Sequence, residues 1–167
     1  MVHLEIRNES SRKRIVRRDV LQRIASRVLA GEARKGAYEV SVLFSDDLFI
    51  AKLNKQFRNK RGPTDVLSFA QESKAFHGAL VLGDIVISLE TVERFCAGDA
   101  AAMREEVRLL FCHGLLHLLG YAHGRSDDKA VMVDKQAAYL KIQPEVAWRN
   151  RAGRKSAPRK ASSRGGA

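Results

Sequence analysis

The sequence predicts a single α+β domain in which a mixed four-stranded sheet packs against a central, buried helix that carries histidines. Three observations support this fold class. The chain of 167 residues is long enough to build one hydrophobic core. Its hydrophobic periodicity predicts strands and helices in the order β-α-β-α-β-β-α-α-α. Residues 107–119 are apolar on nearly every side, which is typical of a helix buried at the centre of a domain.

The first half of the chain predicts three strands joined by two helices. Alternation of apolar and polar residues indicates a half-buried strand at the N-terminus. Ser45 is expected to cap the second helix, and Asp46 and Asp47 suit the positive end of its dipole. Two successive β-α-β units favour parallel strands with right-handed crossovers. The strands cover residues 2–6, 39–44 and 64–69, and the helices cover about 12–34 and 45–56.

The second half predicts one more strand followed by three helices. A polar loop over residues 71–78 separates the third strand from the fourth, so these two adjacent strands are expected to pair antiparallel. Asp99 caps the long apolar helix, and Pro144 is expected to stop the last one. The fourth strand covers residues 79–88, with an interruption at Gly83, and the flanking helices cover about 89–97 and 127–141.

The positive charge lies at the two ends of the chain. The formal net charge is +11, of which residues 1–35 carry +6 and residues 151–167 carry +6. The intervening residues 36–150 carry −1. Residues 149–167 lack core-forming side chains, so we expect a folded domain at 1–148 followed by a basic, disordered tail at 149–167. Basic ends of this kind are attracted to nucleic acid, or are simply solvated.

Composition excludes several classes of protein. No apolar run reaches the ~18 residues that a membrane span needs, and the N-terminus has no apolar signal segment. The two cysteines, Cys96 and Cys112, form no CxxC motif and cannot support a disulfide scaffold. We therefore expect a cytoplasmic protein without membrane contact.

Three of the five histidines fall within eleven residues. His113 and His117 are four residues apart, so they share one face of the long helix. Gly120 suits the left-handed position that ends a helix, which lets the chain bring His123 back toward the other two. Three imidazoles leave one position of a tetrahedral metal open, as in catalytic zinc sites. The alternative is three separate core histidines, each bonded to a carbonyl.

The residue after the first histidine limits the chemistry. The spacing HxxxHxxGxxH is also that of metzincin proteases, which place a catalytic Glu directly after the first His. This chain has Gly114 there. The geometry of the metal ligands is therefore kept while the carboxylate base for peptide hydrolysis is absent.

The histidine segment also resembles a known family. HGLLHLLGYAH is similar to the signature H-G-x-L-H-L-x-G-Y-D-H of the YbeY endoribonucleases, which are bacterial enzymes of rRNA maturation and ribosome quality control. The resemblance covers roughly residues 38–142. Ala122 departs from it, because the family usually has an acid there. Three further blocks support the resemblance: Asn54 to Arg58, Thr64 to Phe69, and Gly83 to Ile85.

The resemblance implies a metal-dependent endoribonuclease domain at 1–148 that cleaves single-stranded RNA. Its implied partners are rRNA, at the 3′ end of the small-subunit molecule, and the small ribosomal subunit. One zinc ion would be held by His113, His117 and His123, although a three-histidine site also suits Ni, Cu or Fe. Arg58 matches the functional Arg of the N-x-x-x-R block and is the implied catalytic residue. Two alternatives stay open: a ribosome-assembly factor with a mainly structural metal, and a metzincin-like metalloprotease.

Overall fold

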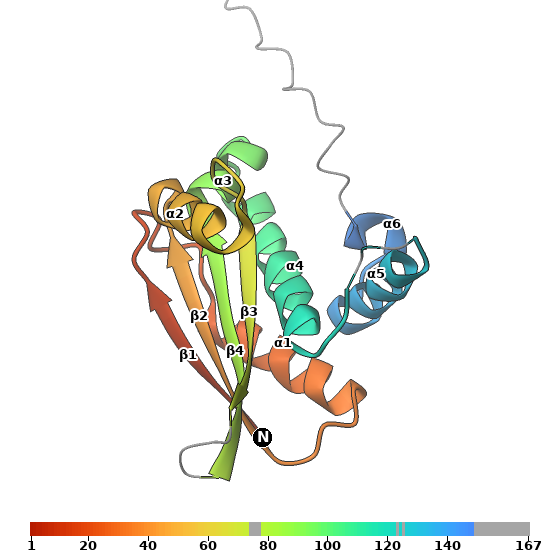
Figure 1. Cartoon of the computed structure of the whole chain (residues 1–167). Helices are drawn as coiled ribbons and strands as arrows, with labels where there is room; N and C mark the ends of the chain where they lie inside the picture. Colours follow the sequence, from red (N-terminus) through yellow and green to blue (C-terminus); the bar gives the residue numbers. More distant parts are fainter. Residues whose placement is uncertain (74–77, 123, 125, 149–167) are drawn as a thin grey trace, which may run out of the picture.

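The computed structural model describes residues 1–73, 78–122, 124 and 126–148 (Figure 1). Four strands form one sheet in the order β1-β2-β4-β3. The strands are β1 (Val2–Asn8), β2 (Ala37–Ser45), β3 (Val66–Ser73) and β4 (Ala79–Ser88). The helices are α1 (Arg18–Gly31), α2 (Asp47–Arg58), α3 (Leu89–Phe95), α4 (Ala100–Leu118), α5 (Ser126–Leu140) and α6 (Pro144–Ala147).

The mixed four-stranded sheet is confirmed, but one pairing expectation is wrong. β1 pairs parallel with β2, β2 pairs parallel with β4, and β3 pairs antiparallel with β4. The second β-α-β unit was expected to make β2 and β3 parallel, whereas β4 lies between them and β3 runs the opposite way. β4 takes the central place because its apolar run is buried on both faces: Ile85, Val86 and Ile87 are 0%, 5% and 0% exposed.

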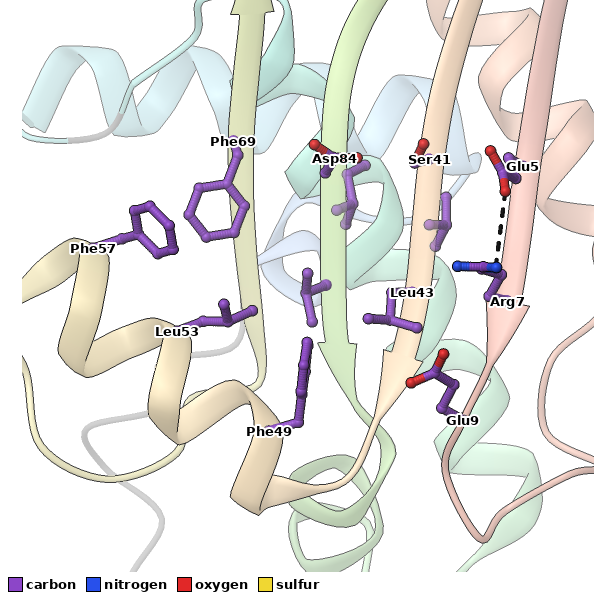
Figure 2. A pocket seen from close by; sticks show the side chains of 13 residues that line it. Glu5, Arg7, Glu9, Ser41, Leu43, Phe49, Leu53, Phe57, Phe69 and Asp84 are labelled. Atoms are coloured by element: carbon purple, nitrogen blue, oxygen red, sulfur yellow. Dashed lines mark ion pairs between the residues drawn. The ribbon is translucent and has the colours of Figure 1, made fainter.

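Helices cover the two faces of the sheet differently. Ile85 and Ile87 of β4 belong to the large core that α1 and α4 complete on one face. Val86 points the other way, where it packs with Ile50 of α2 and Leu67 of β3. Figure 2 shows α2 in front of the strands with α4 behind them. The edge strand β3 therefore separates the end of α2 from the middle of α4.

The central helix α4 begins and ends as its sequence predicts. The Asp99 carboxylate accepts a hydrogen bond from the Ala102 N–H at 2.7 Å, which caps the first turn. At the other end, Gly120 adopts a positive φ of 96° and donates its N–H to the His117 carbonyl at 3.0 Å. Between these caps, Phe111 and Cys112 are fully buried, and burial raises the pKa of the Cys112 thiol to about 12.

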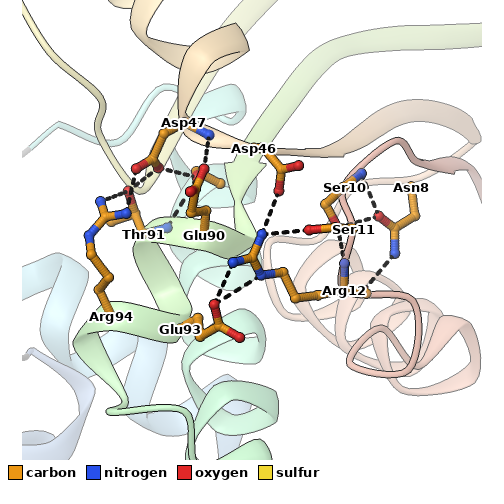
Figure 3. A network of polar contacts seen from close by, with 11 residues as sticks. Asn8, Ser10, Ser11, Arg12, Asp46, Asp47, Glu90, Thr91, Glu93 and Arg94 are labelled. Atoms are coloured by element: carbon orange, nitrogen blue, oxygen red, sulfur yellow. Dashed lines mark hydrogen bonds and ion pairs between the residues drawn. The ribbon is translucent and has the colours of Figure 1, made fainter.

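Helix α1 is shorter than predicted at its N-terminal end. The expected helix over 12–34 begins only at Arg18, because Arg12 is drawn out of any helix by two distant acids. Its guanidinium pairs with Asp46 at 3.0 Å and donates from Nε to Glu93 at 3.1 Å (Figure 3). The hydrogen bond from Arg12 holds the pKa of Glu93 below its ordinary value. Tertiary ion pairing thus overrides local helix propensity here.

The start of α2 also differs from the prediction. Ser45 ends β2, and the N-cap is Asp46, whose side chain makes no capping hydrogen bond. The Asp47 N–H instead donates to the Glu90 carboxylate of α3 at 2.9 Å. The Asp47 carboxylate in turn accepts hydrogen bonds from the hydroxyls of Ser88 and Thr91. Figure 3 shows Asp47 beside Thr91 and Glu90, so α2 and α3 are joined at their N-termini.

Two further boundaries differ from the prediction. β3 extends to Ser73, so it takes part of the predicted loop over 71–78. Pro144 does not merely stop a helix; it opens the short helix α6, a position that suits its missing N–H. The predicted tail at 149–167 lies outside the described residues. None of the described helices is long and apolar enough to span a membrane.

Candidate metal centre

Two of the three predicted metal ligands lie together on the last turns of α4. His113 and His117 approach with their Nε2 atoms 3.0 Å apart, and their rings are nearly perpendicular at 85°. Both side chains are half-buried, so the space beside them is open on one side. The third predicted ligand, His123, lies outside the described residues. Within the described part of the chain, no group of three His, Cys, Asp or Glu residues could hold a metal.

Hydrogen bonds to the Nδ1 atoms determine which ring nitrogens of the two histidines carry lone pairs. His117 Nδ1 lies 2.7 Å from the Tyr121 carbonyl, which can only accept, so this nitrogen carries the proton. Gln136 Nε2 donates to the Ala147 carbonyl at 2.6 Å, which turns Gln136 Oε1 toward His113. His113 Nδ1 is 2.8 Å from that oxygen and must donate to it. Both Nε2 atoms therefore present lone pairs to each other.

This arrangement fits a bound cation. Two lone pairs that face each other repel unless a positive charge lies between or beside them. Two imidazole nitrogens on a tetrahedral zinc ion, each ~2.0 Å from it, would lie about 3.3 Å apart, close to the separation found here. Protein metal sites orient their histidine ligands through a hydrogen bond from the second ring nitrogen, as both rings do here.

A carboxylate on α1 fixes the segment that orients His117. Tyr121 donates its hydroxyl to Glu32 at 2.6 Å, and Lys135 of α5 pairs with the same carboxylate at 2.7 Å. Tyr139 also donates to it. Burial by itself would raise the pKa of Glu32, but these hydrogen bonds outweigh it and hold that pKa below its ordinary value. The ionised carboxylate ties α1, α5 and the end of α4 together around the histidines.

An aromatic ring forms one wall beside the histidines. The Trp148 ring lies edge-on to His113, with centroids 5.7 Å apart. The Lys129 ammonium lies 4.8 Å from the centre of the Trp148 ring, within the range of a cation–π contact. Trp148 follows α6 directly, and α6 receives the hydrogen bond from Gln136 at Ala147. The chain after α5 thus folds back to place Trp148 beside His113.

The structure explains the glycine that replaces the protease glutamate. A Cβ atom at position 114 would lie 2.9 Å from Ile85 Cγ2 and 3.0 Å from Ser68 Oγ. These distances are too short for a side chain, because α4 packs directly against β3 and β4 at this point. Position 114 therefore cannot present a carboxylate to the metal centre, and the structure argues against the metalloprotease alternative.

Arg58 lies on α2, far from the histidines in the chain, and forms no hydrogen bond or ion pair with His113 or His117. It is the exposed last residue of α2, and among the described residues its side chain forms no hydrogen bond or ion pair. The preceding Phe57 meets Phe69 of β3 edge-on, with ring centroids 5.0 Å apart. The neighbour of Phe69, Ser68, faces Gly114 on the other side of the strand. The backbone of Arg58 therefore lies close to β3, the edge strand that packs against Gly114 of α4 on its other face.

A larger cavity lies on the opposite face of the sheet. It has a volume of about 510 Å³ and is formed between α2 and strands β1, β2, β4 and β3. Figure 2 shows Phe49, Leu53 and Phe57 pointing from α2 toward the sheet, with Phe57 beside Phe69 of β3. No histidine lines it, so it is separate from the metal centre. The sequence reasoning did not identify this cavity, because α2 and the four strands meet only in the folded chain.

Sequence reasoning also missed the residues that orient the ligands. Gln136 is 1% exposed, and it lies four residues after Met132 and four before Leu140, both buried. A polar residue on the buried stripe of a helix was the signal that could have identified it. Tyr121 acts through its backbone carbonyl, which no side-chain pattern reports.

Replacing Gln136 with Leu should weaken metal binding by about 10–100-fold, the usual cost of losing a hydrogen-bond partner of a metal ligand. Leu has a similar size but cannot accept the proton of His113 Nδ1, so the ring loses its fixed orientation. Gln136→Glu keeps an acceptor and should retain most of the affinity. Competition with a chromogenic chelator measures the affinity, with the exposed Gln56→Leu as control. Equal affinities for Gln136→Leu and the control would show that Gln136 does not orient the ligand.

Comparisons with known proteins identify the family of this chain. A profile of the family described as Endoribonuclease YbeY matches residues 5–143. A relative of that name from Pelotomaculum thermopropionicum is 42% identical over 125 residues, which span 72% of this chain and 82% of the relative. Another from Geobacillus kaustophilus is 36% identical over 147 residues, 83% of this chain and 94% of the relative.

A solved structure agrees with this assignment. The solution structure of a Thermotoga maritima protein superimposes with a TM-score of 0.57 at 25% identity, covering 83% of this chain and 87% of that one. The family resemblance that the histidine segment suggested is confirmed by the profile, which begins within β1 and continues past the end of α5. The chain belongs to the YbeY endoribonuclease family.

Proposed function

We propose that the protein is a metal-dependent endoribonuclease that cleaves single-stranded RNA in the cytoplasm. Its substrate would be the 3′ end of small-subunit rRNA, and its role would lie in rRNA maturation and ribosome quality control. Residues 1–148 would form the catalytic domain, and the basic residues 149–167 would add attraction to RNA. The observation that carries this proposal is the convergence of two oriented histidine lone pairs at 3.0 Å on a half-buried face of α4.

His113, His117 and His123 would hold one metal ion, for which zinc is our first choice because three imidazoles and an open position suit it. When bound, such an ion supplies Lewis acidity and an activated water near neutral pH. The protein's own contribution begins with orientation. The Tyr121 carbonyl and the Gln136 amide keep both Nδ1 atoms protonated, so both Nε2 atoms carry lone pairs.

Arg58 would stabilise the charge that develops on the phosphate. Its planar guanidinium can donate two parallel hydrogen bonds to phosphoryl oxygens, which a lysine cannot match. Because its side chain has no partner among the described residues, it is free to meet a substrate. Position 114 offers no carboxylate as a general base, so proton transfer is left to solvent. We therefore expect slow turnover.

The half-burial of both histidines favours catalysis over a purely structural metal. Structural zinc sites are closed by four protein ligands, whereas a catalytic site keeps a position open to substrate. His113 and His117 are both partly exposed at the surface of α4. An assembly factor with a structural metal would not need that exposure.

Cleavage of a labelled single-stranded RNA, with and without a chelator, tests the proposed function. The metal-loaded protein should cut the RNA, the chelator should stop cleavage, and added zinc should restore it. A casein digest under the same conditions should stay intact. Cleavage that persists after complete metal removal would refute the proposal, and so would digestion of casein without digestion of RNA.

A further inference from the structure

A second cavity, of about 290 Å³, lies between α1 and α4 and is lined by arginines from both helices. This arginine pocket lies on the side of α4 that packs against α1, away from β3. Two of its arginines, Arg104 and Arg108, are one helical turn apart on α4 and so project from the same face. Its cationic lining consists of Arg17, Arg23, Arg27, Arg104 and Arg108.

The nearby acids do not neutralise these arginines. Asp19 is shared between Arg17 at 3.2 Å and Arg23 at 2.9 Å, and Glu105 pairs with Arg108 at 2.8 Å. Five guanidinium groups thus face two carboxylates. Three of these arginines come from the basic segment 1–35, and Arg104 and Arg108 add to them from a part of the chain, residues 36–150, whose net charge is −1. Cavities lined by one sign of charge raise the local concentration of the opposite ion.

Donor capacity in the pocket is unused. Arg104 forms no ion pair or side-chain hydrogen bond among the described residues. Arg108 binds Glu105 through Nη1, but its Nε is buried and has no hydrogen-bond partner in the described part of the structure. A buried donor without a partner is costly unless a ligand or water satisfies it. Two neighbouring guanidiniums can therefore receive an anion.

The floor of the arginine pocket is apolar. Leu21 and Ile24 of α1 and Val107 of α4 are each at most 2% exposed and line it. A ligand that fills the pocket should accordingly combine an anionic group with a flat, weakly polar body. A nucleotide has this composition, because its phosphates suit arginine forks and its base can cover aliphatic side chains. An acidic peptide would bind the arginines but leave the floor uncovered.

The pocket connects toward the metal centre along α4. A smaller cavity of about 100 Å³ shares Glu105 and Arg108 with it and continues to Val146 of α6. Two residues later, Trp148 lies beside His113 with ring centroids 5.7 Å apart. An extended strand can therefore follow this surface from the arginine pocket to the histidines.

We infer that the arginine pocket binds a nucleotide of single-stranded RNA whose scissile phosphate lies at the metal centre. The inference rests on the proposed RNA substrate, and it adds a second contact at a distance from the cleaved bond. Phosphate contacts of this kind position a strand without reading its sequence. Binding through the pocket is therefore independent of base identity.

Fluorescence anisotropy tests whether the arginine pocket binds RNA. The assay measures binding of a fluorescein-labelled single-stranded RNA of about 12 nucleotides in the presence of a chelator, so that no cleavage occurs. Arg104→Glu should weaken binding on the order of tenfold, and Arg104→Ala should lower the salt slope by about 0.7. The control is Arg34→Glu, an exposed arginine just beyond α1 that lies outside the pocket. It should bind RNA as the wild type does, and all three variants should keep the wild-type melting temperature. Equal losses in Arg104→Glu and Arg34→Glu would overturn the inference.

Steady-state cleavage separates this contact from the chemistry. For the long RNA, Arg104→Ala should raise KM and leave kcat unchanged, because the lost contact is the same in ground state and transition state. An RNA of about four nucleotides, too short to reach both sites, should be cleaved equally by both proteins. Loss of binding in Arg104→Glu without any RNA cleavage by wild type would support the pocket and refute the proposed function. Tighter binding of polyglutamate than of RNA would assign the pocket to an acidic protein and overturn the inference.

Discussion

Arg58→Ala should lower the rate of RNA cleavage by about 10²–10³-fold, the usual effect of removing one donor aimed at charge that develops in a transition state. Metal content and melting temperature should stay at wild-type values. Arg58 is exposed and has no partner among the described residues, so its loss should change the free energy of unfolding by less than about 0.5 kcal/mol. Single-turnover cleavage and thermal melting measure the two effects separately.

Two further variants make this result specific. Arg58→Lys should rescue the rate poorly, because a point charge lacks the two parallel donors of a guanidinium. Lys55→Ala removes an exposed cation from the same last turn of α2 and should leave cleavage near the wild-type rate. If Arg58→Ala cleaves RNA as fast as the wild type, Arg58 has no catalytic role, and only the proposed metal ligands would be left as catalytic groups.

His117→Ala should abolish stoichiometric metal binding. The substitution removes the Nε2 lone pair that lies 3.0 Å from His113 Nε2, so His113 loses the imidazole that faces it. It also removes the proton that the Tyr121 carbonyl accepts, so the segment leading from α4 toward 123 loses an anchor. Elemental analysis of the purified, zinc-loaded protein measures the metal-to-protein ratio, which should fall from one to near zero.

His3→Ala is the matched control for this change. His3 is exposed on β1 and lies far along the chain from the other histidines, so its loss should leave the metal ratio unchanged. Full metal content in His117→Ala would remove the histidine site from the account. An equal loss in both variants would indicate adventitious binding to surface imidazole.

The parts of the fold that local sequence controls were predicted correctly. His113 and His117 share a face because they are four residues apart on one helix. Local hydrogen bonds cap that helix at its start, through Asp99, and at its end, through Gly120. The mixed sheet followed from the order of strands and from their short or helical connections. These features depend on residues a few positions apart, which periodicity and capping rules describe well.

The parts that depend on distant residues were not predicted. The start of α1 is determined by ion pairs from Arg12 to Asp46 and Glu93, which are 34 and 81 residues away. The placement of β4 between β2 and β3 depends on burial of both its faces. Gln136 reaches His113 across 23 residues, and the arginine pocket joins α1 to α4. No local pattern specifies such contacts.

X-ray absorption spectroscopy of the zinc-loaded protein tests the central claim most directly, because it reports the atoms bound to the ion. The account predicts a first shell of nitrogen and oxygen scatterers at ~2.0–2.1 Å with the outer-shell signals of three imidazole rings. In His117→Ala, loaded at excess zinc, any bound ion should show fewer imidazole rings. A shell that contains sulfur at ~2.3 Å, or one without imidazole, would contradict the assignment of the metal to His113, His117 and His123.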